Sequence, residues 1–552
     1  MKLPHHRFLH LAAGLVVLTT SCLSVILGSA ISADSPYDLV LRNARVVDGT
    51  GSPWYRADVA IRGDTIVRIA PSITESAARV IDLGDLVAAP GFIDIHTHAS
   101  RNIFEVPTAD NYSRQGVTTV MEGADGGGSG LAGGLPVPLK PFLDRLEATP
   151  RSINVASFIG QGAVRESVIG LANRAPSADE LERMREVVRQ DMRDGAFGLS
   201  TGLFYVPGAF TPLDEVVELQ KVVAPFRGVH TSHMRDEASL VVESVKETIA
   251  IGELGGVPTH VSHHKIVGKA YWGKSIETLK VIDAARARGI DVTMDQYPYT
   301  ASSSTIQASL LPQWAMEGGI VGAKERLKEP TTRARIKAAT TEILLTERGG
   351  GDPKNVVIVT CDWNPSFAGK NLGEVTEAQG RNSTIDNAAE TVLWLVENGG
   401  CRGVFHAMGE EDLERILVHP ATMIASDGEV TLFGQTAPHP RSYGTFARVL
   451  AVYVREKGII TLEDAVRKMS SFPAARIGLS DRGVLRPGMK ADIAVFDPNR
   501  VRDKATYNQP HQYAEGFAYV IVNGQIVYEN GAMTSARPGR VIYGPGKSAA
   551  VQ

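Results

Sequence analysis

The chain has 552 residues, of which 43% are hydrophobic and 21% are charged. These are ordinary values for a globular protein, and they exclude a disordered or fibrous chain. A formal net charge of −4 and an isoelectric point near 6.4 offer no basic surface, so nucleic acid is not an expected partner. The length exceeds what one hydrophobic core usually supports, so we expect either one large domain with a satellite or two or three domains.

The N-terminus is typical of an export signal. Lys2 and Arg7 precede an apolar stretch that carries no charge from residue 8 to 33, and small residues suited to cleavage lie near Ala30. Residues 1–33 are therefore predicted to be a signal peptide, and the mature protein is expected to be periplasmic or secreted. Two alternatives stay open: an uncleaved anchor helix, since the stretch approaches the thickness of a bilayer, and lipid attachment at Cys22. No second apolar run of this length follows, so no membrane partner is expected beyond such an anchor.

Two cysteines follow the leader, Cys361 and Cys401. In an oxidising compartment they are able to pair, but two buried free thiols fit the sequence equally well. The choice depends on the distance between them, which spacing alone does not give.

Short β segments are predicted at both ends of the mature chain. Residues 38–87 and 485–545 alternate apolar and polar positions and are interrupted by Gly, Asn and Asp. In the C-terminal part, the pair Asn523 and Gly524 is a strong signal for a tight hairpin. The matching pattern predicts one small β-sandwich domain built from both chain ends.

Residues 88–484 alternate short apolar strands with amphipathic stretches of helical length. Strands are predicted at residues 91–98, 116–123, 154–162, 195–201, 227–233, 258–264, 290–297 and 422–428. Eight β then α units in one run predict an α/β fold, a (β/α)₈ barrel of the TIM type, whose catalytic residues come from the C-terminal ends of its strands. Residues 300–420, before the eighth strand, are too many for one barrel loop and predict an insertion that forms a lid over the barrel mouth.

Polar residues of one chemical kind stand at the ends of these predicted strands. Imidazole and carboxylate are the ligands expected for zinc or a similar divalent ion, and alternate residues of a strand face the same side. The sequence therefore predicts a metal site at the barrel mouth, with the ligands His96, His98, Asp125, His233, His263 and Asp427.

Each of these residues also has an interpretation without a metal. His230, His260 and His264 flank the chosen histidines and show that histidine is frequent in this region. Asp125 and Asp427 both precede glycine, and Asp-Gly is a common turn pair. The metal hypothesis depends on the joint arrangement by strand order, because a site is assembled from convergent groups.

A series of motifs along residues 38–543 resembles one known protein family. They are "PGFIDIHTH", "GVTTV", "GLSTGLFYVPG", "SHMRDE", "SHHK", "DQYPY", "ASDG" and "HPRSYGTF", with the terminal segments "GVLRPGMKADIAVFDP" and "VIVNGQIV". In this order they resemble the amidohydrolase superfamily, and within it the D-aminoacylase family of N-acyl-D-amino-acid deacylases.

The resemblance implies a role for each matching residue. His96 and His98 would bind one metal position, His233 and His263 the other, and Asp427 would be the catalytic carboxylate. Many family members have a metal-binding cysteine where this chain has Asp125, and Glu122 is a second candidate for that ligand. Zinc is expected, in one or two copies, and an all-nitrogen-and-oxygen ligand set leaves manganese, iron or cobalt as alternatives.

The expected substrate is an N-acyl-D-amino acid with a free carboxylate, a small molecule whose linear amide is cleaved; its D configuration is implied by the resemblance alone. Amide hydrolysis needs an activated water and charge stabilisation at the carbonyl oxygen, which a divalent ion supplies, with Asp427 as general base. Cationic and aromatic residues near the strand ends are predicted to bind the carboxylate. They are Arg235, Lys265, Tyr297 and Arg441. Alternatively, Arg235 forms an ion pair with Asp236 or Glu237, and Arg441 braces a loop.

Two other functions are considered. A cyclic amidase of the hydantoinase or dihydropyrimidinase type typically needs a lysine on the fourth strand, and "GAFGLST" has none. A non-catalytic barrel would be expected to have lost Asp427 or a histidine, and each is present. The acyl group, the side-chain specificity and the oligomeric state are not predicted.

Overall fold

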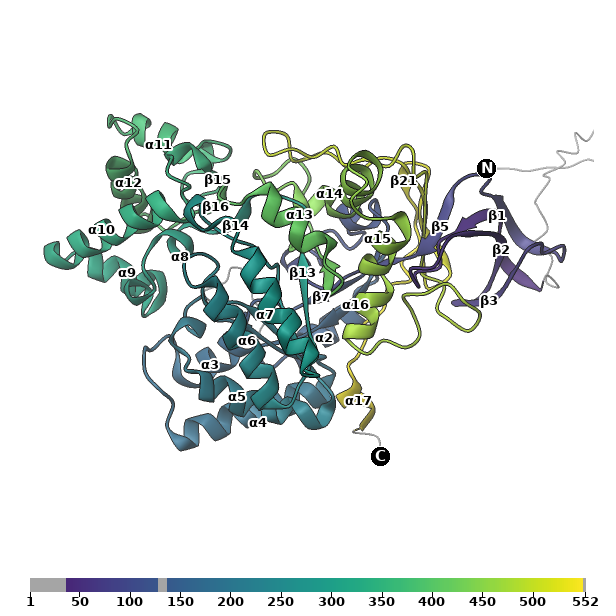
Figure 1. The fold of residues 1–552 in the computed structure, drawn as a ribbon, viewed down its shortest axis with the longest axis horizontal. Coiled ribbons are helices and arrows are strands. Elements are labelled where there is room, and N and C mark those ends of the chain that lie inside the picture. Colours follow the sequence, from purple (N-terminus) through teal and green to yellow (C-terminus); the bar gives the residue numbers. More distant parts are fainter. Residues whose placement is uncertain (1–35, 128–136, 550–552) are drawn as a thin grey trace, which may run out of the picture.

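A computed structural model describes residues 36–127 and 137–549 of the chain. The predicted signal peptide, with Cys22, lies outside these residues. Within them, no helix combines the length and the apolar character that a membrane span requires. Figure 1 shows a central barrel with a mainly helical insertion on one side and a β-sheet domain on the other.

The predicted barrel strands are present in the described part of the chain, and they pair in parallel. The third strand is split at Phe158, so that its first half pairs with the second strand and its second half with the fourth. A parallel bridge from Thr97 to Gly428 joins the first strand to the last and closes the ring. In chain order the strands are β6 (Phe92–Asp94), β7 (Val117–Glu122), β8 (Asn154–Ser157) with β9 (Ile159–Gly160), β10 (Gly198–Gly202), β11 (Val229–His233), β12 (Thr259–Val261), β13 (Val292–Gln296) and β17 (Thr422–Ile424).

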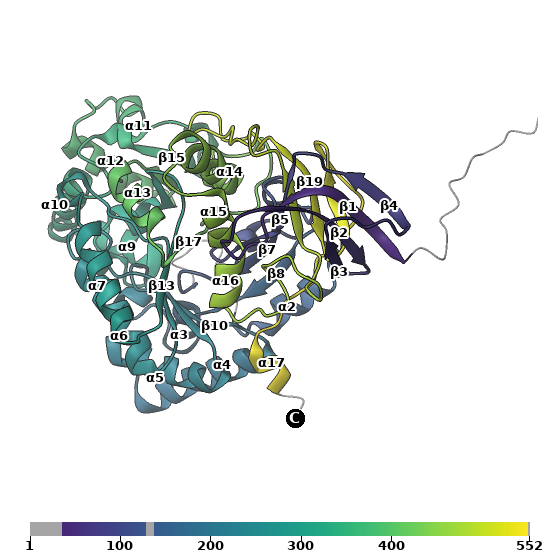
Figure 2. The same cartoon turned by 45° about the vertical axis from the view of Figure 1, so that its right-hand side comes forward.

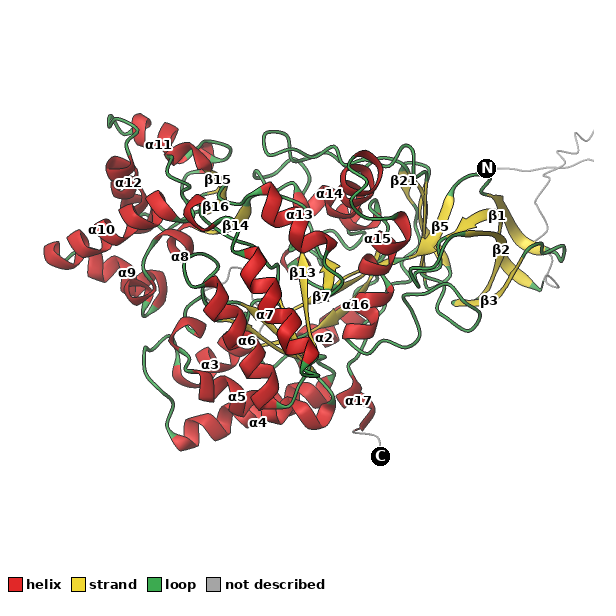
Figure 3. Ribbon diagram, in the orientation of Figure 1, coloured by secondary structure: helices red, strands yellow, loops and turns green. Residues whose placement is uncertain are grey.

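Helices cover the outside of the ring (Figure 3). The predicted helix at residues 178–194 shows how the sequence fixes their ends: Ser177 and Glu180 form a capping box at its start, and Gly195 ends it in the left-handed conformation. The helices of this layer are α1 (Asp110–Ser113), α2 (Lys140–Glu147), α3 (Gln161–Ile169), α4 (Ala178–Asp194), α5 (Leu213–Val223), α6 (Val241–Gly255), α7 (Ser275–Ala287), α13 (Glu410–Val418), α14 (Arg441–Arg448), α15 (Leu462–Met469) and α16 (Ser471–Arg476).

The insertion between β13 and β17 has its own antiparallel sheet, in the order β14-β16-β15, and its own hydrophobic core. Cys361 and Cys401, whose pairing the sequence left open, form a disulfide in it, with Cα atoms 4.5 Å apart. Its elements are β14 (Ser302–Thr305), α8 (Ile306–Leu310), α9 (Gly319–Leu327), α10 (Pro330–Thr346), β15 (Val356–Thr360), α11 (Leu372–Ala378), α12 (Ile385–Glu397) and β16 (Arg402–Phe405).

Both chain ends contribute to one β domain, as predicted, and its described strands are hydrogen-bonded in one continuous sheet of nine (Figure 2). The two ends meet where β5 pairs antiparallel with β18, for example Ala88 opposite Val495. The strands are β1 (Tyr37–Val46), β2 (Tyr55–Arg62), β3 (Thr65–Ala70), β4 (Ala77–Asp82), β5 (Val87–Pro90), β18 (Ile493–Phe496), β19 (Phe517–Val522), β20 (Gln525–Glu529) and β21 (Ala532–Met533). The short helix α17 (Pro545–Ala549) follows them and packs on α4.

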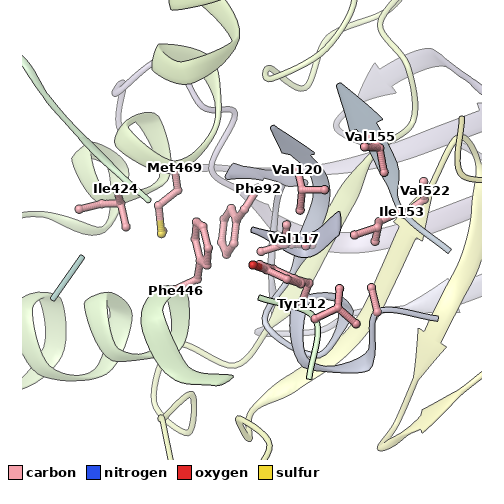
Figure 4. Packing of buried hydrophobic residues seen from close by; sticks show 14 of the residues in the cluster. Phe92, Tyr112, Val117, Val120, Ile153, Val155, Ile424, Phe446, Met469 and Val522 are labelled. Carbon is pink, nitrogen blue, oxygen red and sulfur yellow. The ribbon is translucent and has the colours of Figure 1, made fainter. Parts of the chain in front are cut away.

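One hydrophobic core joins the barrel to this sheet (Figure 4). Phe92 of the first barrel strand stacks on Phe446 of α14, with ring centroids 5.6 Å apart, and Val522 of β19 belongs to the same cluster. Burying a phenylalanine side chain contributes roughly 1.5–3 kcal/mol. This packing fixes the first barrel strand, which leads directly into two of the predicted metal ligands, His96 and His98.

Candidate metal centre

The six predicted metal ligands converge at the C-terminal mouth of the barrel. All are buried, and they form two groups that share Asp125. In each group one donor atom from every residue lies within 4.8 Å of the others. The first group is His96, His98, Asp125 and Asp427; the second is Asp125, His233 and His263.

The distances within these groups suit a bound ion better than direct hydrogen bonds. Asp125 Oδ1 lies 3.3 Å from both His96 Nε2 and His263 Nε2, and 3.8 Å from His233 Nδ1. Its other oxygen, Oδ2, lies 3.4 Å from His98 Nε2. Two ligands that are each about 2.1 Å from a tetrahedral ion are roughly 3.4 Å apart. The Asp125 carboxylate is therefore placed between the two groups.

The hydrogen-bond inventory is a separate test of metal binding. Both ring nitrogens of His96 and of His233, and Oδ1 of Asp125, are buried without a hydrogen-bond partner among the described residues. Buried polar atoms are nearly always partnered, so several in one place need an explanation. A divalent cation would bind one ring nitrogen of each histidine together with Asp125 Oδ1, while the other ring nitrogen carries the proton of the neutral imidazole. The donor set therefore fits such an ion.

Backbone geometry at the site is unusual. Asp125, His263 and Asp427 have φ values of +58°, +33° and +49°, in the left-handed region that costs non-glycine residues energy. Asp125 is held by close packing: a Cβ at Gly202 of β10 would lie 2.1 Å from the carbonyl oxygen of Asp125. Only glycine allows β10 to approach this loop so closely.

Two further carboxylates hold the ligands in place. Glu237 lies 3.2 Å from His263 Nδ1 and accepts hydrogen bonds from Lys265 and Arg348. Asp295 accepts a hydrogen bond from the backbone N–H of His263 and lies 3.6 Å from His96 Nδ1. Such outer carboxylates orient metal-ligating imidazoles.

Asp427 is tied into the mouth from both sides. Its Oδ1 lies 3.2 Å from His98 Nε2, and its Oδ2 lies 2.8 Å from Arg441 Nη1. Burial alone would raise the pKa of Asp427, but the Arg441 guanidinium and the ring of His96 hold that pKa well below its ordinary value. The carboxylate is thus kept ionised at neutral pH.

Three of the four predicted carboxylate-binding residues lie at the pocket, and the fourth does not. Lys265 and Arg441 line the pocket at the barrel mouth. Tyr297 is buried beneath them, with its ring centroid 4.7 Å from the Arg441 guanidinium and 5.7 Å from Lys265 Nζ, so it supports both cations. The prediction for Arg235 is wrong in its placement: it binds Glu247 and the carbonyl oxygens of Ala209 and Thr211 outside this pocket. Strand β11 ends at His233, so Arg235 does not keep the facing of an extended strand.

The alternative ligands are occupied elsewhere. Glu122 accepts hydrogen bonds from the hydroxyl of Thr97 and from the backbone N–H groups of Ala99 and Ser100, so the structure favours Asp125. The flanking histidines are bound by hydroxyl or carboxylate groups of neighbouring strands and helices, as in an ordinary core. These are His230 with Thr201 and Thr259, His260 with Thr293 and Asp295, and His264 with Thr278.

Several residues of the site were missed by the sequence analysis. Glu237 and Asp295 lie inside the quoted motifs "SHMRDE" and "DQYPY", so a signal existed for both. The insertion contributes others that no motif indicated, since their neighbours come from distant segments. They are the hydroxyl series Ser302, Ser303, Ser304 and Thr305, with Val359, Arg348 and Arg402.

A TIM-type barrel with a histidine and carboxylate cluster at its C-terminal mouth is the architecture of metal-dependent barrel enzymes, and metal-dependent hydrolases are one such class. The sequence model of the Amidohydrolase family matches residues 360–528 of this chain. The chain is 35% identical over 529 residues to a D-aminoacylase of Alcaligenes xylosoxydans xylosoxydans, with 93% of this chain and 98% of that protein covered. It also resembles the crystal structure of an N-acyl-D-glutamate deacylase from Bordetella bronchiseptica, complexed with zinc and a phosphonate inhibitor, with a TM-score of 0.77, 32% identity and coverage of 92% and 99%. The chain belongs to the D-aminoacylase family of amidohydrolases.

The cyclic-amidase alternative is less well supported. A dihydropyrimidinase from Brevibacillus agri is 15% identical, with a TM-score of 0.55 and coverage of 91% of this chain and 98% of that one. This likeness shows a shared fold alone. The fourth strand, β10, has the sequence GLSTG and offers no lysine.

Proposed function

We propose that the protein is a metal-dependent N-acyl-D-amino-acid deacylase, which hydrolyses a linear amide to a carboxylate and a free D-amino acid. The observation that carries this proposal is the convergence of six buried donor groups, several of them without hydrogen-bond partners among the described residues. The two relatives described above are named as a D-aminoacylase and an N-acyl-D-glutamate deacylase. Their names support the same substrate class and the D configuration for this protein.

We propose zinc as the bound metal, in one or two copies. His96, His98, Asp125 and Asp427 would hold one ion, and Asp125, His233 and His263 the other. When bound, such an ion lowers the pKa of water and polarises the amide carbonyl. The all-nitrogen-and-oxygen donor set is also compatible with manganese, iron or cobalt.

Asp427 would be the proton carrier. Its Oδ1 faces the ligand cluster while Oδ2 is held by Arg441, so Oδ1 is the oxygen available for proton transfer. In the reaction, Oδ1 accepts a proton from the attacking water as the new C–O bond forms. The same proton then passes to the nitrogen as the C–N bond breaks, which releases a neutral amine.

Lys265 and Arg441 would bind the α-carboxylate of the substrate. Both line the pocket, and the buried ring of Tyr297 limits their movement. Residues of the insertion cover this end of the barrel mouth, and such cover strengthens charge interactions by excluding water.

We also propose that the protein is exported, to the periplasm or the medium. The charged and apolar pattern of residues 1–33 supports this location. The disulfide between Cys361 and Cys401 also supports it, because disulfides persist in oxidising compartments. The N-terminal sequencing of protein from a membrane-free culture fraction would test both cleavage and release.

The test of the activity is a panel of N-acetyl D- and L-amino acids, assayed before chelation, after chelation and after return of each metal. We expect turnover of D substrates that disappears with the metal and returns with zinc. Metal content measured by mass spectrometry gives the stoichiometry. Full activity in protein without metal, or a preference for L substrates, would contradict the proposal.

A further inference from the structure

The pocket contains a second positively charged corner that the proposed reaction does not use. Arg101, Arg402 and Glu429 all line it. Both guanidinium groups bind the same carboxylate oxygen, Glu429 Oε2, with Arg402 Nη1 at 3.2 Å and Arg101 Nη1 closer. In this group, two positive charges therefore share one negative charge.

This corner is separate from the cations assigned to the α-carboxylate. Arg441 already faces Asp427, and Lys265 shares the buried Glu237 with Arg348 beside the second metal group. The Arg101 and Arg402 corner adjoins the same first metal group as Arg441, since Glu429 follows Asp427 by two residues. The pocket thus presents Arg101 and Arg402 in addition to Arg441 and Lys265.

Apart from Val359 and the ring of Tyr205, the side chains that line the pocket are mostly polar. Strand β14, which carries Ser302, Ser303, Ser304 and Thr305, contributes hydroxyl-bearing residues to this lining. Hydroxyl groups hydrogen-bond a carboxylate well, and guanidinium groups bind it with charge assistance.

We propose that the corner formed by Arg101, Arg402 and Glu429 binds a second carboxylate of the substrate, so that the preferred substrates are dianionic N-acyl-D-amino acids. This inference rests on the proposed function and narrows its substrate class. The second carboxylate belongs either to the amino-acid side chain or to the acyl group, and both sources offer the same chemistry to Arg402.

The state of Arg402 supports this assignment. Its side chain is 20% exposed, and its buried Nε has no hydrogen-bond partner among the described residues. Burial, and next the charge of Arg101, lower the pKa of Arg402 to about 10. A bound anion would offset both effects, because an opposite charge stabilises the protonated guanidinium.

The test compares substrates that differ in one charge. With the metal-loaded protein we expect kcat/KM for N-acetyl-D-glutamate to exceed that for the near-isosteric N-acetyl-D-glutamine by about tenfold or more. Comparing kcat/KM for N-succinyl-D-alanine with that for N-butyryl-D-alanine tests whether the corner binds a second carboxylate on the acyl group. Equal rates within both pairs would overturn the proposal.

Variants assign the preference to the corner. Arg402→Gln should bring the glutamate to glutamine ratio close to one, while Arg402→Lys should keep part of it. Arg235→Gln is the matched control, since Arg235 lies outside this pocket, and it should leave the ratio unchanged. A fall in Arg402→Gln that is equal for both substrates would overturn the proposal, because it would place Arg402 at the α-carboxylate or in the scaffold.

The failure of the proposed function would look different. In that case no N-acyl-D-amino acid is hydrolysed, and titration calorimetry with the same compounds decides on the subsite. Tighter binding of N-acetyl-D-glutamate than of N-acetyl-D-glutamine, lost in Arg402→Gln, would support the corner as an anion site. Equal binding would overturn it.

Discussion

Asp427 and Arg441 form a buried ion pair, 2.8 Å from Oδ2 to Nη1, that leaves the other carboxylate oxygen facing the metal ligands. The two carboxylate oxygens of Asp427 thereby have different roles. Arg441 orients it, and Oδ1 is free to exchange protons with the substrate. The pair also spans two elements, since Asp427 follows β17 and Arg441 begins α14.

Asp427→Asn tests the proton-carrier role. The amide keeps the size of the side chain but has no basic oxygen at neutral pH, so we expect kcat to fall by about 10²–10⁴-fold. Metal content and melting temperature are measured on the same sample. If the variant keeps its metal and its turnover, the general base is another residue.

Gly202→Ala tests how Asp125 is held. A Cβ at this position would lie 2.1 Å from the Asp125 carbonyl oxygen, so the loop that carries the ligand must move. We expect weaker metal affinity, by about 10–100-fold, which is the usual cost of disturbing the support of a ligand. Competition with a chromogenic chelator measures it. Gly273→Ala is the control for general destabilisation, because its positive φ strains an alanine while a Cβ there meets no atom within 4 Å; it should leave metal affinity unchanged.

The sequence predicts the barrel and its ligands well because both depend on local patterns. The strands that end at Asp94, His233 and Val261 follow from short apolar runs, and their metal-binding histidines stand at or within four residues of these ends. Parallel strands of a barrel must place their C-terminal ends together. Arg235 fails because β11 stops two residues before it, and strand ends are poorly fixed by pattern. Arg348 and Arg402 could not be predicted, since they reach the pocket through the tertiary packing of an insertion that no periodicity describes.

The disulfide of the insertion should support its stability. Cys361 and Cys401 are 40 residues apart in sequence, and closing such a loop in the unfolded chain is worth about 3–4 kcal/mol in the chain-entropy description. We expect the Cys361→Ser, Cys401→Ser double variant to open first in the insertion. Hydrogen exchange monitored by mass spectrometry should show faster exchange in α11 and α12 than in the barrel strands. Unchanged exchange in these helices would mean that the core of the insertion suffices.

The stacking of Phe92 on Phe446 should be a main support of the first barrel strand. Phe92 is fully buried, and its ring lies 5.6 Å from that of Phe446 at an interplanar angle of 15°. Phe92→Ala leaves a cavity in this core, so we expect a loss of about 3–5 kcal/mol in the free energy of unfolding. Urea titration followed by fluorescence measures the loss, with Leu254→Ala as a control because Leu254 is 57% exposed and should change stability by less than about 0.5 kcal/mol. The same strand leads into His96 and His98, so metal affinity should fall together with stability. If the variant loses stability but keeps full metal affinity, the two histidines are held by other contacts.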